Sequence, residues 1–161
     1  SPIRVRAHGG GRMSEPVFSA WIAGLPAPQG SKRHVGGGRM VESSKKVAPW
    51  REAVVNAIHA HHDGPWPLFP QHMPLSVSLT FTLPAPLSLP KTRPSSPSKK
   101  PDLDKLVRAT FDALTTSGLW VDDSQAVEMR ARKTYPEATT GAHFMALAWP
   151  GVRIFIRPDT D

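Results

Sequence analysis

Five aspartates lie within residues 101–133 of a chain whose remaining charge is strongly basic. They are Asp102, Asp104, Asp112, Asp122 and Asp123. Carboxylate oxygens are ligands that Mg²⁺ prefers in proteins, and a metal-bound water can attack a phosphodiester. The basic run at 91–100, just upstream, is suited to holding a phosphate backbone beside such a metal. The pattern therefore predicts metal-dependent cleavage of a nucleic acid.

Three of these acids form the predicted metal site. Crowded carboxylates repel one another, and a bound divalent cation is the usual remedy. We therefore expect Asp102 and Asp104, at the start of a helix, to lie beside Asp123 and to share one or two Mg²⁺ ions with it. Metal bound there would polarise the scissile phosphate and lower the pKa of the attacking water.

The same acids also allow a purely structural interpretation. Asp102 is well placed as an N-cap, and Asp104 in the first turn would interact favourably with the helix dipole. Asp104, Arg108 and Asp112 stand at i, i+4 and i+8, where they would form a ladder of surface ion pairs. The adjacent acids at 122–123 would then be a polar turn before a strand.

The size and charge of the chain suit a single domain with a polyanionic partner. The chain has 161 residues, a mass of 17.6 kDa, a net charge of +7 and a pI of about 10.3. We expect one domain at 15–161, preceded by a flexible basic arm at 1–14. The charge favours nucleic acid, although a solvated basic surface on an unrelated domain would have the same composition.

Two absences in the sequence exclude other classes of protein. Because the sequence has no cysteine, disulfides, thiolate zinc sites and cysteine nucleophiles are excluded. No apolar run is long enough to cross a membrane, and the N-terminus lacks the apolar core of a signal peptide. We therefore expect a cytoplasmic location.

Hydrophobic periodicity and turn residues predict a small α/β (α+β) fold, with a mixed sheet and two main helices. One helix is expected at about 47–62, and a second from Leu103 to near Gly118, where glycine suits a helix end. Residues 75–83 alternate cleanly and predict a strand with one buried face. The proline-rich segment 84–101, which we call the basic loop, is expected to be mobile. The other expected strands, which include a hairpin, lie at about 17–22, 32–35, 39–41, 126–135, 143–149 and 152–156.

Some histidines and aromatic residues invite a functional interpretation that we consider weaker. His59, His61 and His62 lack the further ligands that a closed zinc site needs, and are expected to be surface residues. Aromatic side chains that could stack on bases are expected instead in the core or in loop packing. These are Trp50, Trp66 and Phe69.

The order and spacing of the acidic segment resemble the RusA-type Holliday-junction resolvases. Their signature begins with Asp-Leu-Asp-Asn/Lys-Leu, continues with Asp-Ala-Leu, and ends with an apolar pair before Asp-Asp-x-Gln-Val-Val. This chain has Asp102-Leu103-Asp104-Lys105-Leu106, then Asp112-Ala113-Leu114, and finally Trp120-Val121-Asp122-Asp123-Ser124-Gln125-Ala126-Val127. Weaker similarity covers most of residues 16–157.

The resemblance implies a small homodimer that nicks four-way DNA junctions with Mg²⁺ in DNA recombination and repair, in a bacterial, phage or prophage setting. It places the essential carboxylates and metal ligands at Asp102, Asp104 and Asp123. The essential lysine of the family falls at Arg108, and many members have asparagine where Lys105 stands. Either cation is therefore a candidate to offset charge in the transition state. Because a four-way junction has two-fold symmetry, two symmetric nicks call for two copies of the site.

Basic residues outside this cluster are expected to hold the DNA backbone with little sequence preference. They are Lys32, Arg33, Lys91, Arg93, Lys99, Lys100 and Lys133. Two other functions stay open at this point: a non-catalytic protein that binds branched DNA, and a nuclease for flaps and simple branches. Carboxylates that face phosphate weaken binding unless a metal intervenes, which argues against the first.

Overall fold

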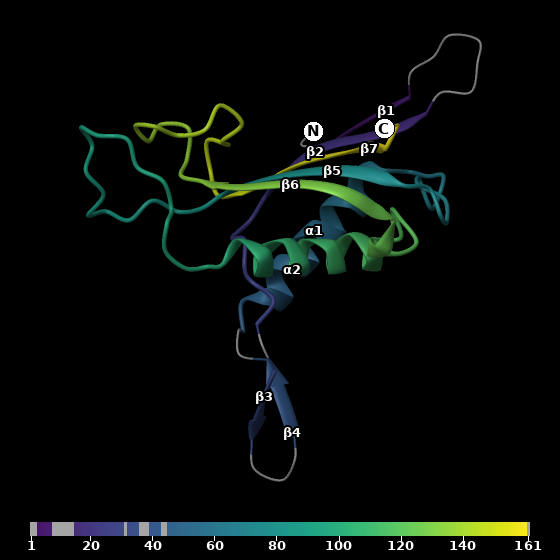
Figure 1. Cartoon of the computed structure of the whole chain (residues 1–161), viewed down its shortest axis with the longest axis horizontal. Coiled ribbons are helices and arrows are strands. Elements are labelled where there is room, and N and C mark those ends of the chain that lie inside the picture. The colour runs from purple at the N-terminus through teal and green to yellow at the C-terminus, as the bar shows by residue number, and fades with distance from the viewer. Residues whose placement is uncertain (1–2, 8–14, 31, 36–38, 43–44, 161) are drawn as a thin grey trace.

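The computed structural model describes residues 3–7, 15–30, 32–35, 39–42 and 45–160. Within them, one mixed sheet carries the fold, and two helices cover one of its faces (Figure 1). The strands of this sheet are, in spatial order, β1 (Ile3–Ala7), β2 (Pro16–Ala23), β7 (Gly151–Pro158), β5 (Leu75–Thr82) and β6 (Ala126–Thr134). A separate antiparallel hairpin consists of β3 (Lys32–Val35) and β4 (Arg39–Glu42).

The sheet is mixed because one pair of described strands is parallel. β5 and β6 run in the same direction, with Ser78 opposite Arg130. Parallel neighbours cannot be joined by a tight turn, and the chain crosses between them through α2 (Leu103–Ser117). The β1–β2, β2–β7 and β5–β7 pairs are antiparallel. The prediction of a small mixed sheet with two main helices is confirmed.

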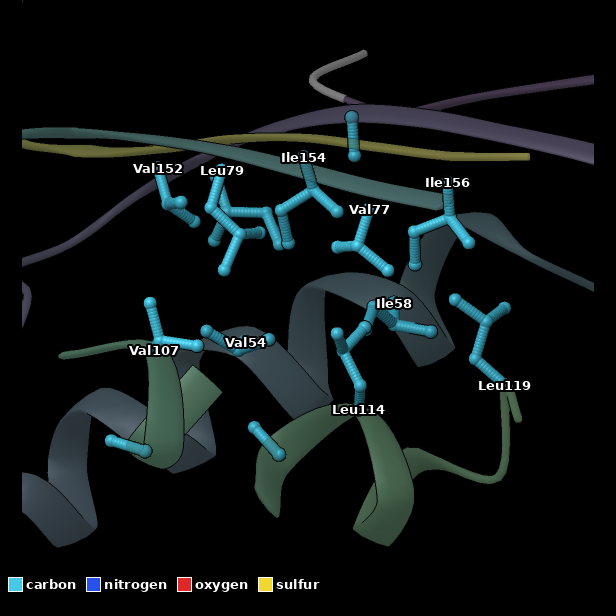
Figure 2. Packing of buried hydrophobic residues seen from close by; sticks show 14 of the residues in the cluster. Val54, Ile58, Val77, Leu79, Val107, Leu114, Leu119, Val152, Ile154 and Ile156 are labelled. Atoms are coloured by element: carbon cyan, nitrogen blue, oxygen red, sulfur yellow. The ribbon is translucent and has the colours of Figure 1, made fainter. Parts of the chain in front are cut away.

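The hydrophobic core lies between the sheet and the two helices (Figure 2). α1 (Val47–His61) contributes Val54 and Ile58, and α2 contributes Val107 and Leu114. They meet alternate residues of β5 and β7, because successive side chains of a strand point to opposite faces. These strand residues are Val77, Leu79, Val152, Ile154 and Ile156. Burial of each such side chain contributes about 1.5–3 kcal/mol, so this layer fixes α2 firmly under the sheet.

Both helices lie where the sequence predicts them. α2 ends at Gly118, whose φ of +83° is a left-handed conformation that glycine adopts without strain. The predicted strands at 17–22 and 126–135 and the hairpin at 32–41 are also confirmed. No helix among the described residues is long and apolar enough to span a bilayer.

The prediction that β5 has one buried face is wrong. Ser76, Thr80 and Thr82 are buried as well as the apolar residues that alternate with them. β5 has a neighbour on each edge, and the longer side chains of β6 and β7 cover its small hydroxyl residues. Ser76 Oγ, for example, donates a hydrogen bond of 3.1 Å to Glu128 on β6.

The predicted strand at 143–149 does not form. The N–H of Ala146 donates to the carbonyl of His143 (2.9 Å), which closes a turn. The N–H of Leu147 donates to Thr82 Oγ1 (2.9 Å), and both Ala146 and Leu147 are buried. The apolar residues of this segment therefore cover one end of the sheet and do not extend it.

Two terminal segments also differ from the prediction. Residues 1–14 were expected to be a flexible arm, yet Ile3–Ala7 pair with β2 as a strand. The other residues of that arm lie outside the described part of the chain. The last strand, expected as a short one at 152–156, is β7 at the centre of the sheet between β2 and β5.

Candidate active site

α2 separates the predicted metal ligands into two groups, one at each end of the helix (Figure 1). Asp102 immediately precedes α2 and Asp104 lies in its first turn. Asp122 and Asp123 follow the far end, where Asp123 begins the short 3-10 helix η1 (Asp123–Gln125). At about 1.5 Å per residue, the 15 residues of α2 span roughly 22 Å. Ligands of one Mg²⁺ lie about 2.1 Å from it, and paired metals stand about 4 Å apart. The expectation that Asp123 lies beside the helix start is therefore wrong within one chain.

The start of α2 exposes two carboxylates to solvent. Asp102 occupies the N-cap position with an extended backbone, but its side chain makes no capping hydrogen bond. Its Oδ2 lies 3.5 Å from Nζ of Lys105. Asp104 is exposed one residue into the helix, where the helix dipole favours a negative charge. Asp102 thus occupies the predicted N-cap position, but its side chain does not make the hydrogen bond expected of a cap.

A cleft of about 570 Å³ opens beside this helix start, and Asp102 is on its wall. The lysines that also line it are Lys46, Lys99, Lys100 and Lys105. The lining also includes the loop at 26–30, which is held to α2 because the N–H of Gln29 donates to the carbonyl of Lys105 (3.0 Å). A cleft with several lysines and one aspartate suits a polyanion.

Lys133, predicted as a phosphate contact, holds the basic loop against the start of α2. Its Nζ donates to the carbonyls of Lys99 (2.8 Å) and Pro101 (2.9 Å). Thr140 Oγ1 donates to the carbonyl of Lys91 (2.9 Å) and fixes the loop at a second point. The loop therefore has defined anchors although it contains no helix or strand. Because an ammonium has three donors, Lys133 keeps one for another partner.

The other predicted DNA contacts fall into two groups. Lys91, Arg93, Lys99 and Lys100 are exposed on the basic loop. This loop runs at the same end of the molecule as the start of α2 (Figure 1). Lys32 and Arg33 belong to β3, and their side chains lie outside the described part of the structure.

Acids crowd together at the far end of α2. Burial raises the pKa of Asp123, and a hydrogen bond with Asp122 and the charges of Asp122 and Asp112 raise it further. The pKa of Asp122 is lowered, mainly because Ser124 Oγ donates a hydrogen bond of 2.7 Å to its Oδ2. No ion pair reaches these three acids from any cation that the structure describes. A divalent cation is the kind of partner that would relieve this crowding.

Gln125 fixes the turn that carries these acids. Its buried side-chain Oε1 accepts hydrogen bonds from the N–H groups of Val121 (2.9 Å) and Asp122 (3.0 Å). Its Nε2 donates to the carbonyls of Pro70 (2.9 Å) and Met73 (3.2 Å). The sequence analysis quoted Gln125 in the motif but gave it no role. The signal was an uncharged polar residue directly between a pair of acids and a strand.

Arg108 does not form the predicted ladder. Among the described residues, no ion pair joins it to Asp104 or Asp112. Its guanidinium is exposed on α2, between the two groups of acids. Arg108 lies four residues after Asp104 and is therefore nearer to the acids at the start of α2.

The described residues of one chain include no group of three acids or histidines close enough to hold a metal ion. His59 and His62 face backbone carbonyls, and the expectation of a surface position is wrong for His62, which is buried. Their Nε2 atoms lie 2.8 Å from the oxygen of Ser117 and 3.1 Å from that of Pro65. Both rings also meet Trp66 edge-on, with centroids 5.3 and 4.7 Å away.

Known proteins are similar to this chain. The family model described as endodeoxyribonuclease RusA matches residues 23–156, which include both ends of α2. The chain is 51% identical over 35 residues to the crossover junction endodeoxyribonuclease RusA of Enterobacteria phage 82. The proteins of that name from Escherichia coli K12 and Shigella sonnei give the same identity over the same length. The match covers 22% of this chain and 29% of each relative, less than a third of the relatives' length.

Proposed function

This chain belongs to the RusA family of endodeoxyribonucleases, and we propose that it resolves four-way DNA junctions with Mg²⁺ as cofactor. The relatives it matches are named as crossover junction endodeoxyribonucleases and come from a phage and from enterobacteria. The lysine-lined cleft and the basic loop supply a surface for the phosphate backbone at the start of α2. A cytoplasmic protein that acts on bacterial or phage DNA is consistent with these features.

The observation that carries the proposal is the separation of the acids along α2. No single chain joins the two groups, but two chains related by a two-fold axis do so if their α2 helices pack antiparallel. Asp102 and Asp104 of one protomer then lie beside the partner's Asp123, because helices pack with axes 8–10 Å apart. The same axis makes a second identical site at the other end of the helix pair. The homodimer is thus part of the active site.

We place the partner on an apolar flank that consists of Val121, just before η1, and of Val127 and Met129 on β6. β6 is an edge strand of the described sheet, and α2 leaves its first half uncovered. Val127 is 59% exposed, Met129 46% and Val121 41%. These residues adjoin the acids at 122–123, so a second copy that covers them also comes close to those acids. Burial of such a flank is what stabilises an isologous dimer.

The donor set at the joined site fits Mg²⁺. Hard cations take carboxylate oxygens, and Asp102, Asp104 and the partner's Asp123 would supply them. The raised pKa of Asp123 marks a carboxylate crowded by burial and by other acids, which a bound cation would favour in its charged form. When bound, Mg²⁺ would polarise the scissile phosphate and lower the pKa of the attacking water.

The remaining residues position the DNA and offset its charge. Arg108 is exposed between the two groups of acids, where its guanidinium would contact the phosphate oxygens as charge develops on them. Lys105 lines the cleft and pairs with Asp102, so it would both hold backbone and orient that carboxylate. Gln125 fixes Asp122 through hydrogen bonds and positions the turn of Asp123.

Two inactive variants mixed together test this proposal sharply. Asp104→Asn and Asp123→Asn should each fail to cut a synthetic four-way junction in Mg²⁺. In a mixed dimer both substitutions fall in one composite site, and the other site is intact. After subunit exchange at random, about a quarter of all sites are intact, and nicking should return. A cruciform plasmid should then yield nicked circles, whereas the wild type yields linear product.

The control is a mixture of Asp102→Asn and Asp104→Asn, which lie at the same end of α2. Each site of that mixed dimer carries one substitution, so activity should stay absent. Failure of the first mixture to recover would place each site within one chain and contradict the composite arrangement. Equal cleavage of junctions, flaps and simple branches by the wild type would favour a broader branch nuclease, and EDTA should stop any of these reactions.

A further inference from the structure

The face of the sheet opposite the helices carries a second concentration of cations. Both helices lie on one side of the sheet (Figure 1), and Val77, Leu79 and Ile154 point to that side. The residues that alternate with them therefore point to the other side. In the described part of the chain no helix lies on this side, which we call the open face.

Strand register defines the residues of the open face. One row across the sheet joins Ser19, Phe155, Ser78 and Arg130. The next row joins Trp21, Arg153, Thr80 and Arg132, and a third joins Arg157, Ser76 and Glu128. Among the residues whose side chains the structure describes, these rows contain four arginines and one acid, so the face has a net positive charge.

The arginines of the open face keep donors for a ligand. Arg153 Nε donates to the carbonyl of Met145 (3.0 Å), and Arg157 Nη1 to that of Pro158 (3.2 Å). Each guanidinium has five N–H donors, so most remain. Arg130 is 3.8 Å from Glu128 in an ion pair that leaves its side chain 85% exposed. Exposed pairs of this kind contribute little, and phosphate would compete for the arginine.

The shape of the open face also suits a nucleic acid. Small hydroxyl residues run along β5 at its centre, and Phe155 is 38% exposed beside them. Ser76 and Thr80 are buried, whereas Ser78 is half-buried and can donate to a phosphate oxygen that approaches the centre of the face. A strand of eight residues is about 26 Å long. Over that length duplex DNA presents roughly 15 negative charges, at one per about 1.7 Å. A second copy of this chain would place arginines against arginines and is disfavoured by charge.

We propose that the open face is a second DNA-binding surface, which holds the phosphate backbone of a duplex arm while the composite site holds the branch point. The proposal rests on the proposed function, because it assigns the open face to the same DNA. Its contacts are sequence-independent and come from Arg130, Arg132, Arg153 and Arg157.

Salt dependence of binding tests the proposal with matched substitutions. Arg130→Gln combined with Arg132→Gln should weaken binding of a catalytically inert junction roughly 10-fold in about 0.1 M salt. The slope of log K against log salt should fall by about 1.8, because each phosphate contact contributes about 0.9. Glu128→Gln, on the same face, should tighten binding. Glu52→Gln, the same substitution on the exposed side of α1, should leave affinity unchanged.

Crosslinking locates the DNA directly, because the chain has no cysteine. Ser78→Cys places a single thiol at the centre of the open face, and Ala60→Cys places one on the exposed side of α1. Labelled with an azidophenacyl group and irradiated with a junction whose arms are longer than 20 base pairs, Ser78→Cys should crosslink to an arm. Ala60→Cys should not.

Three results would overturn the proposal. If the double arginine variant has the affinity and the salt slope of the wild type, the proposed arginine contacts do not exist. The proposed function would still stand in that case, provided that the wild type cuts junctions. A change in particle mass in that variant would make the open face a protein interface. If the wild type neither binds nor cuts a junction, the proposed function fails and the second surface fails with it.

Discussion

The two ends of α2 carry acids in opposite electrostatic settings. At its start, Asp102 and Asp104 are exposed beside the helix N-terminus, and Lys105 lies 3.5 Å from Asp102. At its far end, burial and the acids at 122 and 112 raise the pKa of Asp123. The start of the helix therefore compensates its carboxylates within the chain, and the far end does not.

This difference teaches which group of acids depends on a partner. A cation and a helix N-terminus offset the charge of a nearby carboxylate without a metal. Crowded carboxylates repel one another, and a bound ligand or a second chain can reduce this repulsion. In the proposed antiparallel dimer, the helix start of one protomer, with its lysines, would lie beside the crowded acids of the other. The start of α2 would thus supply the cations that the far end of the partner's α2 lacks.

Removal of single acids should have the largest effect and tests whether both ends take part in the reaction. Asp102→Asn, Asp104→Asn or Asp123→Asn should lower the nicking rate at least about 100-fold, because each would remove a proposed metal ligand. Junction binding should stay equal or become slightly tighter, since a repelling charge is lost. The measurements are single-turnover cleavage and gel-shift affinity in Ca²⁺. A variant that cuts at close to the wild-type rate would remove its residue from the site.

Separation of the two proposed protomers should abolish nicking, because the acids at opposite ends of α2 would no longer form one site. Val127→Glu puts a charge on the apolar flank of β6, where dimer burial would leave it unpaired. We expect a monomeric mass by light scattering and loss of nicking, with an unchanged circular dichroism spectrum. Asn56→Glu, on the exposed side of α1, is the matched control and should behave as the wild type. A dimeric Val127→Glu protein would move the interface elsewhere.

The sequence predicted the elements at both ends of α2 but not the distance between them. Leu106, Val107 and Leu114 recur at helical spacing, and Gly118 ends the helix, so its length of 15 residues could be predicted. The motif nevertheless suggested one cluster, because its acids belong to a single signature. Residues of one signature need not be close in space, and the length of α2 keeps these two groups of acids apart within one chain.

Other predictions failed because tertiary contacts decided the outcome. The segment 143–149 has apolar residues that suit a strand, but Thr82 captures the N–H of Leu147 and the segment turns. The polar residues of β5 appeared exposed because pairing on both edges is not visible in one strand's alternation. The role of Gln125 depends on carbonyls of Pro70 and Met73, which lie far away along the chain.

Two cations on α2, Arg108 and Lys105, are candidates to offset charge in the transition state, and substitution of each distinguishes them. Arg108→Ala should lower the single-turnover rate about 100-fold with little change in junction affinity, if its guanidinium offsets transition-state charge. Lys105→Ala should instead weaken binding and cost less than about 1 kcal/mol of stability, because its pair with Asp102 is exposed. The reverse pattern would assign the transition-state role to Lys105. Arg108→Lys is the conservative variant and should restore part of the rate.

The smallest expected effect concerns the stability of the uncompensated end in the absence of metal. Because burial and neighbouring acids raise the pKa of Asp123, the folded chain holds its proton more tightly than the unfolded chain does. Its ionisation therefore destabilises the fold as pH rises above the unfolded value, and the full penalty is present above the folded pKa. In EDTA at pH 7, Asp123→Asn should raise Tm by a few degrees at most, and the difference should vanish near pH 3. Asp63→Asn, which changes an exposed aspartate elsewhere, should not raise the Tm.

Added Mg²⁺ should stabilise the wild type more than Asp123→Asn, because only the wild type keeps the crowded carboxylate whose charge the ion would offset. Equal Tm values for wild type and variant at every pH, measured by scanning calorimetry, would show that the far end of α2 is not electrostatically strained.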